Sequence, residues 1–382
     1  KLLKKIIKII HLPSSVGGNP QGISKHLNKL GLKSQTWVYN QNYLNYPIDK
    51  ILSKSKNKLI IEFYKLFALK YIFKFDIIFF NWGSGLYRPF PFIYIKKKKI
   101  IKRIFFSIYC FYSNFLSRIE IFIIKLLKKP IFIQYQGDDA RQGDYCAKNF
   151  KIHFASRVPK SYYNNSSDEL KRKSIKFYSD VATKIYALNP DLLHVLPKSA
   201  EFLPYSNVDL EEWTPIYNQI ENRPLRIGHA PTNRLVKGTD IIIKAINMLK
   251  KKYDLNFTLI ENLKNKQAKE KYKNIDIFID QLFAGWYGGV AVEVMALGKP
   301  VISYIREKDL IYVPKKMRDQ LPIINTSPKT IYSTLEKILN TPRNQILYLG
   351  KKSRTYVEKW HNSKKIAKRI KKDVVEAMSR KS

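Results

Sequence analysis

Short apolar runs and amphipathic stretches alternate along the whole chain. An apolar run of about four to eight residues is typical of a buried strand, and apolar residues three or four positions apart are typical of a helix. Strands that alternate with helices are joined by right-handed crossovers and form a parallel sheet. In the first half this pattern predicts strands at 5–12, 35–39, 75–82, 130–136, 182–188 and 200–204, and helices at 21–30, 59–73, 100–127 and 166–179.

A stretch without periodicity, 206–223, interrupts the alternation, which then starts again. We therefore predict a first domain at 1–205, a linker, and a second domain at 224–355. Two Rossmann-like, doubly wound parallel-sheet domains of this kind would face each other across a cleft, and ligands would bind beyond the carboxyl ends of their strands. The second domain is predicted to contain strands at 225–229, 255–261, 275–280, 300–304 and 321–325, and helices at 238–251, 264–272 and 290–297.

The composition indicates the number of domains and the cellular compartment that we expect. The 382 residues suffice for two domains of ordinary size. Cys110 and Cys146 are too few for a disulfide framework and do not form a C-x-x-C pair, which favours a reducing compartment. Residues 1–10 lack the unbroken apolar stretch of a signal peptide, and the most apolar segment, 104–117, is shorter than the roughly 20 residues of a bilayer span. These features predict a cytoplasmic protein.

The formal net charge is +40, from 70 Lys and Arg against 30 Asp and Glu. A field of this sign attracts nucleic acid, anionic lipid or anionic substrates. Lys, Ile and Asn are abundant along the whole chain, so a bias in composition explains the charge equally well. No motif that reads DNA or RNA is visible, and nucleic acid is not expected as a partner.

One segment, 96–129, departs from the alternation. It carries ten Lys or Arg against a single acid, Glu120, and aromatic residues are interleaved with the basic ones. A helix with an apolar side and basic flanks suits an anionic membrane surface, which would make the protein peripheral on the inner face of the cytoplasmic membrane. A long core helix with a solvated Lys face is the alternative, and spacing alone does not separate the two.

The strongest motif spans 229–239, between a predicted strand and a predicted helix. The start of a helix carries unpaired N–H groups and a partial positive charge. Arg234 and Lys237 add two cations there. Together these groups would form a socket for a diphosphate and would stabilise the charge that develops on a departing nucleotide. A surface turn with two solvated cations is the alternative.

A second motif spans 280–302 and is predicted to run from strand through glycine-rich loop to helix. Gly288 and Gly289 would let backbone N–H groups approach a ligand closely. Glu293 lies in the first turns of the helix, where a carboxylate can accept both hydroxyls of a ribose. A helix-start Glu that is favoured by the helix dipole is the alternative.

Two weaker motifs follow strands of the first half. Gly17 and Gly18 form a turn after the first strand, as in loops that approach a phosphate or a sugar, although plain turns also use such pairs. Trp82 ends the third strand. It is a candidate for stacking on an acceptor sugar, or it fills the core.

Three charged residues follow the fourth strand. Asp138 and Asp139 are candidate catalytic residues that would position an acceptor hydroxyl or a donor sugar, and Arg141 would hold an anion on the acceptor side. The alternative is an Asx turn in which Asp caps the next helix. Adjacent acids also suit Mg²⁺. No D-x-D pattern supports a metal elsewhere, and no metal is expected.

These motifs resemble those of the bacterial glycosyltransferases of family 4, which have the GT-B fold and retain the anomeric configuration. Arg234 with Lys237-Gly238, and the stretch 288–301 with Glu293, carry the resemblance. The stretches 137–141, 280–281 and 285–288 are similar to a less characterised branch. The resemblance implies a metal-independent reaction without a cofactor. It also implies that the last helix, which is expected to start at Arg354 and to form the segment 356–382, crosses back onto the first domain.

The resemblance also assigns roles to the donor-binding residues. It implies that Arg234 and Lys237, as catalytic cations, hold the donor diphosphate, that Glu293 holds the nucleotide ribose, and that the loop of Gly17 and Gly18 closes on the donor. The family has an earlier Glu that contacts the donor sugar, where this chain has Gly285. Either another polar residue substitutes for it or the donor differs. The candidate substitutes are Asp280 and Gln281.

Three function classes follow from the sequence. The first is a glycosyltransferase that moves a sugar from a nucleotide-sugar donor to a glycan or lipid-linked acceptor, in the synthesis of cell-surface polysaccharide or lipopolysaccharide. The second, suggested by Gly285, is a non-catalytic protein of the same fold that binds a sugar nucleotide or acts as a scaffold. The third, suggested only by the charge, is nucleic-acid binding.

Overall fold

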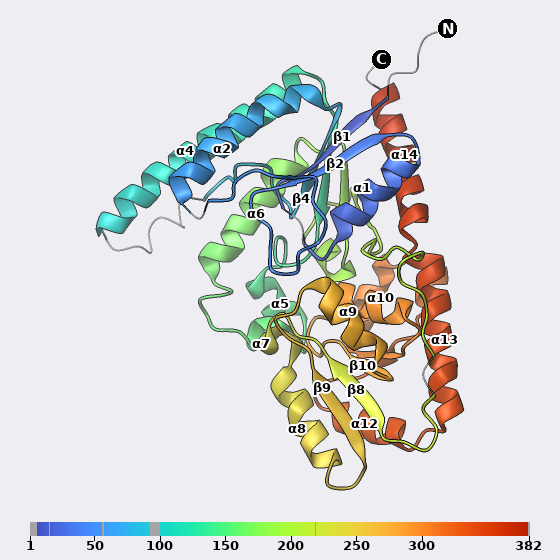
Figure 1. Cartoon of the computed structure of the whole chain (residues 1–382). Helices are drawn as coiled ribbons and strands as arrows, with labels where there is room; N and C mark the ends of the chain where they lie inside the picture. The colour runs from blue at the N-terminus through green and yellow to red at the C-terminus, as the bar shows by residue number, and fades with distance from the viewer. Residues whose placement is uncertain (1–5, 15, 56, 92–99, 218, 381–382) are drawn as a thin grey trace.

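The computed structural model describes residues 6–14, 16–55, 57–91, 100–217 and 219–380. Two α/β units are visible, one around a seven-stranded sheet and one around a five-stranded sheet (Figure 1). All strand pairs in both sheets are parallel. The predicted fold class, α/β with two doubly wound parallel sheets, is confirmed.

The first sheet has the strand order β3-β2-β1-β4-β5-β6-β7. All residues of β4 and β5 are buried, because helices cover both faces of a parallel sheet. The order reverses between β1 and β4, and this switch point opens a crevice at their carboxyl ends. The strands are β1 (Lys8–Leu12), β2 (Lys33–Val38), β3 (Lys50–Ile51), β4 (Ile77–Asn81), β5 (Ile131–Tyr135), β6 (Lys184–Ala187) and β7 (Ala200–Phe202).

Helices connect the strands of the first sheet. The turn before the first of them uses Gly17 and Gly18, whose φ angles of 59° and 72° lie in the left-handed region that glycine adopts most readily. The helices are α1 (Asn19–Lys29), α2 (Lys58–Leu69), α4 (Ile100–Leu126), α5 (Gly143–Asn149) and α6 (Asn165–Ser179), with short 3₁₀ helices η1 (Lys70–Lys74), η2 (Phe154–Ser156) and η3 (Pro190–His194).

The second sheet has the strand order β12-β11-β10-β8-β9, and its order reverses between β8 and β10. Its strands are β8 (Leu225–His229), β9 (Leu255–Leu259), β10 (Ile277–Ile279), β11 (Val301–Ser303) and β12 (Ile324–Asn325). The helices around it are α7 (Arg234–Lys237), α8 (Thr239–Leu249), α9 (Asn265–Lys273), α10 (Gly289–Ala296), η4 (Glu307–Tyr312), α11 (Lys315–Arg318) and α12 (Ile331–Leu339).

Two helices end the described chain, α13 (Arg343–Trp360) and α14 (Ser363–Ser379). The expectation of one helix through Arg354 and onward is wrong, because the chain breaks at Asn362, whose side chain accepts hydrogen bonds from the backbone of Lys364 and Lys365 and starts a new helix. Helix α14 packs along α1 of the first unit (Figure 1).

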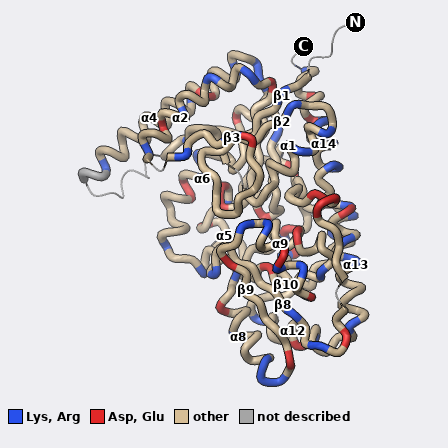
Figure 2. The backbone as a smooth tube through the Cα atoms, in the orientation of Figure 1, with Lys and Arg blue, Asp and Glu red and all other residues tan. Residues whose placement is uncertain are grey.

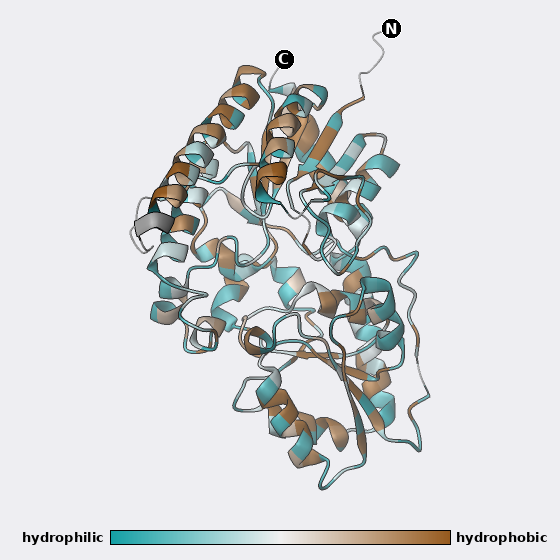
Figure 3. Cartoon of the chain, turned by 60° about the vertical axis from the view of Figure 1, so that its left-hand side comes forward, coloured by the Kyte–Doolittle hydropathy of each residue, from teal (hydrophilic) through white to brown (hydrophobic). Residues whose placement is uncertain are grey.

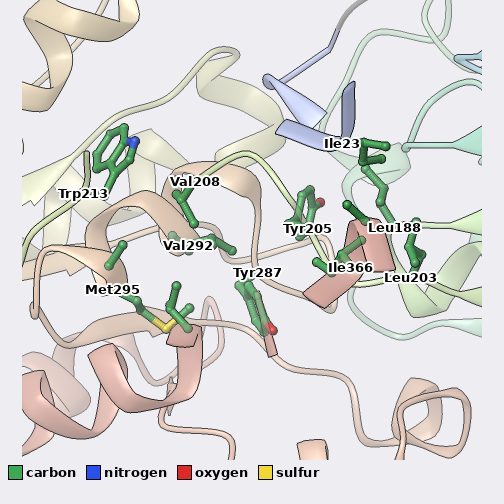
Figure 4. Close-up of a cluster of buried hydrophobic side chains, with 14 of the residues drawn as sticks. Ile23, Leu188, Leu203, Tyr205, Val208, Trp213, Tyr287, Val292, Met295 and Ile366 are labelled. Atoms are coloured by element: carbon green, nitrogen blue, oxygen red, sulfur yellow. The ribbon is translucent and has the colours of Figure 1, made fainter. Parts of the chain in front are cut away.

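Residues 206–223, predicted as a linker, contribute to a core that continues from one unit to the other. Figure 4 shows Tyr205 and Val208 beside Val292 of α10 and Ile366 of α14. Trp213 is also buried in this cluster. The two sheets are therefore connected by packed side chains as well as by the chain itself.

Helices α2 and α4 project together from the first unit (Figures 1 and 3). They contact each other where the Tyr109 hydroxyl donates to the Glu62 carboxylate at 3.4 Å. Of the basic segment 96–129, residues 96–99 lie outside the described residues. Within the described part of the chain, no helix is both long enough and apolar enough to pass through a bilayer. Lys and Arg occur along the entire tube in Figure 2.

Candidate functional site

The two motifs of the second half follow the two strands at its switch point. Strand β8 leads into the segment with Arg234 and Lys237, and its neighbour β10 leads into Asp280. His229, at the end of β8, ties the two strands and the next helix together. One ring nitrogen contacts the Ile279 carbonyl and the other contacts the Thr239 hydroxyl, each at 2.8 Å. Burial lowers the pKa of His229 to about 4, so the ring is neutral at physiological pH.

Lys237, Asp280 and Gly288 form one cluster at the start of α10. The Lys237 ammonium lies 2.7 Å from one oxygen of the Asp280 carboxylate, and the Gly288 N–H donates to the other at 2.6 Å. A Cβ on Gly288 would lie 3.3 Å from the Lys237 ammonium, so glycine lets the cation reach the helix N-terminus. Both charged side chains are buried. The cluster places a cation beside the unpaired N–H groups of a helix of eight residues.

Arg234 lies one turn before Lys237 but points elsewhere. The helix predicted at 238–251 is α8, and the short helix α7, which was not predicted, precedes it; Gly238 separates the two with a left-handed φ of 77°. The Arg234 guanidinium binds both oxygens of Glu261, at 2.8 and 2.5 Å, and its side chain is 58% exposed. Each of the two predicted diphosphate cations therefore has a carboxylate partner in this structure.

Glu293 is fully buried in the second turn of α10. One oxygen of its carboxylate accepts hydrogen bonds from the Tyr46 hydroxyl at 3.0 Å, from Asn265 at 3.0 Å and from Asn207 at 3.3 Å. Burial raises the pKa of Glu293 to about 7, although these donors lower it. A carboxylate that accepts from hydroxyl and amide donors can also accept from the hydroxyls of a ligand.

Tyr46 joins the two halves of the site. Its hydroxyl binds Glu293 of the second unit, and its ring lies against Gly18 of the first, where a Cβ would approach the ring to 2.7 Å. A backbone hydrogen bond of 3.0 Å from the Asn265 N–H to the Leu44 carbonyl holds the same loop. The glycine turn at the switch point of the first sheet thus faces Glu293 across a single aromatic ring.

Gly285, which stands where the glycosyltransferases that the sequence resembles have a Glu, lies beneath an arginine. Its φ is 85°, and an added Cβ would meet the Arg306 guanidinium at 2.5 Å. Arg306 is held by the Asp309 carboxylate at 2.7 Å. Gln281 donates its amide N–H to the Trp286 carbonyl, inside the loop. Neither of the suggested substitutes for the missing Glu is without a partner, since Asp280 binds Lys237.

Asp138 and Asp139 have different surroundings. Asp139 is buried and accepts hydrogen bonds from the backbone N–H groups of Gln136 and Gly137, which precede it, so it holds the loop after β5 but neither forms an Asx turn nor caps α5. Burial raises its pKa to about 6. Asp138 accepts from the hydroxyls of Tyr162 and Tyr163, each at 2.5 Å, and its side chain is 27% exposed. Of the two, only Asp138 is partly exposed to solvent.

Arg141, predicted to hold an anion, binds a buried carboxylate of its own unit. Its Nε and one Nη contact the two oxygens of Asp191 at 2.5 and 3.1 Å. A bidentate pair of this kind is strong and costly to separate. The geometry favours a structural role for Arg141.

Trp82 is half-buried and has a positive φ of 64°. It lines an open hollow of about 260 Å³ at the carboxyl ends of β1 and β4. Pro13, Ser14 and Val16, from the loop that leads to the glycine turn, line the same hollow. Of the residues predicted from the first sheet, Trp82 lines this hollow, and Gly17 and Gly18 directly follow its lining residue Val16 along the chain.

The site contains polar residues that sequence reasoning missed. Tyr46, Asn207 and Asn265 all bind Glu293, and Arg306 covers Gly285. They lie in loops or at helix starts that are far apart in the sequence, and no spacing marks them. Among the described residues, no group of three or more His, Cys, Asp and Glu side chains could hold a metal ion. Metal independence remains a prediction.

No family model and no curated protein matches the chain. Solved structures match it over nearly its full length. They include sucrose-phosphate synthase from Thermosynechococcus elongatus (13% identity, 98% of this chain and 99% of that one, TM-score 0.59) and a glycosyltransferase from Rickettsia africae (14%, 98% and 99%, 0.56). HepE from Anabaena, solved with UDP-glucose, is 11% identical, and the match covers 98% of this chain and 99% of that one with a TM-score of 0.54. The chain has the GT-B fold that these glycosyltransferases share.

Proposed function

We propose that the protein is a glycosyltransferase that uses a nucleotide diphosphate-sugar as donor. One observation carries the proposal. The glycine turn at the switch point of the first sheet, the buried Glu293, and the cluster of Lys237 with the start of α10 meet at the facing edges of the two units. Ligands of open α/β sheets bind at this kind of place.

The donor would bind along α10. Its diphosphate would lie at the N-terminus of that helix, against Lys237 and the Gly289 N–H, and the Gly288 N–H would exchange the Asp280 carboxylate for a phosphate oxygen. Its ribose would take the position of the Tyr46 hydroxyl on Glu293. Arg234 would exchange Glu261 for a phosphate oxygen, which its exposure allows.

The reaction would proceed with retention of the anomeric configuration. The acceptor hydroxyl attacks the anomeric carbon on the face from which the nucleotide leaves. As the bond between that carbon and the diphosphate oxygen breaks, the oxygen keeps the electron pair and takes the proton of the acceptor hydroxyl. Lys237, Arg234 and the start of α10 would stabilise the charge on the diphosphate, so that no metal ion is needed.

The acceptor would bind on the first unit, in the hollow beside Trp82. An indole can stack on a sugar ring. The Asp138 side chain is partly exposed, and its carboxylate could exchange a tyrosine hydroxyl for a hydroxyl of the acceptor. We propose a glycan or lipid-linked acceptor in the synthesis of a cell-surface polysaccharide or lipopolysaccharide. The positive charge of the chain suits an acceptor that carries phosphate.

A melting screen against UDP, GDP, CMP and their sugars tests donor binding, since a ligand that binds the native state raises the Tm. The donor found in this way is then used in a transfer assay with a membrane extract. R234A should lose transfer by about a hundredfold or more with an unchanged Tm, because this side chain is exposed. R380A, which removes another exposed arginine from an ion pair, is the control.

Lys237 requires a different variant. Truncating it leaves the buried Asp280 carboxylate unpaired, which costs about 3–5 kcal/mol of stability. The double variant K237M/D280N removes both charges and separates folding from transfer. If R234A and K237M/D280N both kept near wild-type turnover, this assignment of the site would be wrong.

One observation favours a second function, non-catalytic binding of a sugar nucleotide. The position of the family's sugar-binding Glu is held by Gly285, and Arg306 fills the space above it. Under this alternative, a nucleotide raises the Tm but no sugar is transferred from any donor in the screen. Transfer from one donor excludes it.

A further inference from the structure

Helices α2 and α4 leave a large apolar surface without a partner in the structure. Along α4, the side chains of Ile104, Ile108, Phe111, Phe115, Phe122 and Leu126 are exposed. Their spacing of three, four and seven residues puts them on one stripe of the helix, about 33 Å long at 1.5 Å per residue. On α2, Leu59, Phe63 and Phe67 are exposed at the same kind of spacing.

This surface is concentrated in one part of the molecule. More than half of the exposed large apolar side chains among the described residues belong to α2, η1 and α4. Single exposed apolar residues are ordinary on a protein surface, but a continuous stripe marks an interaction surface. The most exposed members are Leu59 at 80% and Phe111 at 76%.

The stripe is not the result of a loosely packed helix. The opposite side of α4 is fixed to the body by Glu120, which is buried and accepts hydrogen bonds from the backbone N–H groups of Leu86 and Tyr87. The Ser113 hydroxyl donates to the Arg88 carbonyl at 2.8 Å. The loop with these residues follows β4 and Trp82, so the stripe is rigidly connected to the proposed acceptor crevice.

The charges around the stripe are almost all positive. Arg103, Arg118 and Lys125 are exposed along α4, and the Lys70 ammonium lies 3.1 Å from the centre of the Phe67 ring. No acidic side chain is exposed within 57–74 or 103–129, since Glu62 and Glu120 both face inward. Aromatic rings with basic side chains beside them fit the boundary between lipid headgroups and acyl chains.

We propose that the outer stripes of α2 and α4 dock onto an anionic lipid surface. Apolar side chains would enter the acyl boundary while the basic side chains bind lipid phosphates. A second copy of the chain is the less suitable occupant, because two surfaces of the same positive sign repel each other. The docking itself does not depend on the proposed function. Only its purpose rests on that function, because a glycosyltransferase with a lipid-linked acceptor would meet the acceptor at a membrane.

Sedimentation of the full chain with vesicles tests the proposal without any sugar donor. The protein should sediment with vesicles of phosphatidylcholine and phosphatidylglycerol, much less with phosphatidylcholine alone, and less again at high salt. F111S/F115S should weaken binding by roughly a hundredfold or more, the order expected for two phenylalanines withdrawn from an apolar medium. I311S/Y348S, which changes exposed apolar residues elsewhere, is the matched control.

Three results would overturn the proposal: no sedimentation with either vesicle, equal binding by F111S/F115S and the wild type, or a dimer in solution that F111S/F115S abolishes. The last result would assign the stripe to a second copy. The nucleotide-induced rise in Tm should be the same in F111S/F115S and in the wild type. If the vesicles bind but no nucleotide raises the Tm, the proposed function fails while the docking surface stands.

Discussion

Glu293 is the residue on which the proposed donor site depends most. It is a buried carboxylate with a pKa raised to about 7 by burial, and three neutral donors stabilise its ionised form without a cation in contact. Such a group is half protonated near neutral pH. A ribose hydroxyl donates more strongly to the carboxylate than to the protonated acid, so the charge of this one residue should control affinity for the donor.

Donor affinity should therefore rise with pH. Glu293 is mostly protonated below its pKa of about 7 and ionised above it, and the ionised form accepts both ribose hydroxyls. The Kd of a nucleotide-sugar should fall by roughly tenfold between about pH 6 and about pH 8, because the ionised fraction of a single carboxyl with a pKa of about 7 rises by that factor over this range. Isothermal titration calorimetry measures this, and a Kd that rose with pH would contradict it. E293Q should bind more weakly, with a flat pH profile.

Tyr46 should compete with the nucleotide. Its hydroxyl binds the same carboxylate oxygen that the ribose is proposed to use. Y46F removes one hydrogen bond, worth about 1 kcal/mol, from the ligand-free protein and should tighten nucleotide binding by roughly fivefold. Y43F, in the same loop, is the control, because no hydrogen bond ties its hydroxyl to Glu293. Weaker binding by Y46F would mean that the hydroxyl assists the nucleotide instead.

At the scale of elements, apolar runs predicted the central strands because both faces of a parallel sheet are buried. The runs around β4 and β5, where every side chain is buried, are examples. Strand β3 was missed, since two residues at a sheet edge leave no pattern. The motifs that follow β8 and β10 could be predicted as well, because strand order brings them together. The contact of Tyr46 with Glu293 could not, since it joins a loop to a helix 247 residues away.

The glycine turn before α1 should be sensitive to a methyl group. Gly18 and Gly31 both have a positive φ, so alanine strains the backbone at either position, by about 1 kcal/mol. Only at Gly18 does the added Cβ meet the Tyr46 ring, whereas at Gly31 nothing lies within 4 Å. G18A should therefore lower the Tm more than G31A and change nucleotide affinity. Equal effects of the two variants on both measurements would argue against close contact between Gly18 and Tyr46.

At the scale of the molecule, the two units pack against each other. A hydrophobic core that includes Ile23, Val292 and Ile366 continues across the junction. The pair of His194 with Asp309 joins η3 to η4 at 3.0 Å. The two-domain GT-B fold could be predicted from the alternating pattern, but these contacts could not, because each depends on how the domains close.

A crystal structure with the nucleotide that raises the Tm most is the direct test of the donor site. We predict that the diphosphate contacts the Lys237 ammonium and the N–H groups of Gly288 and Gly289, and that the ribose binds Glu293 in place of the Tyr46 hydroxyl. A nucleotide bound elsewhere, with Tyr46 still on Glu293 and Lys237 still paired only with Asp280, would contradict the proposed function.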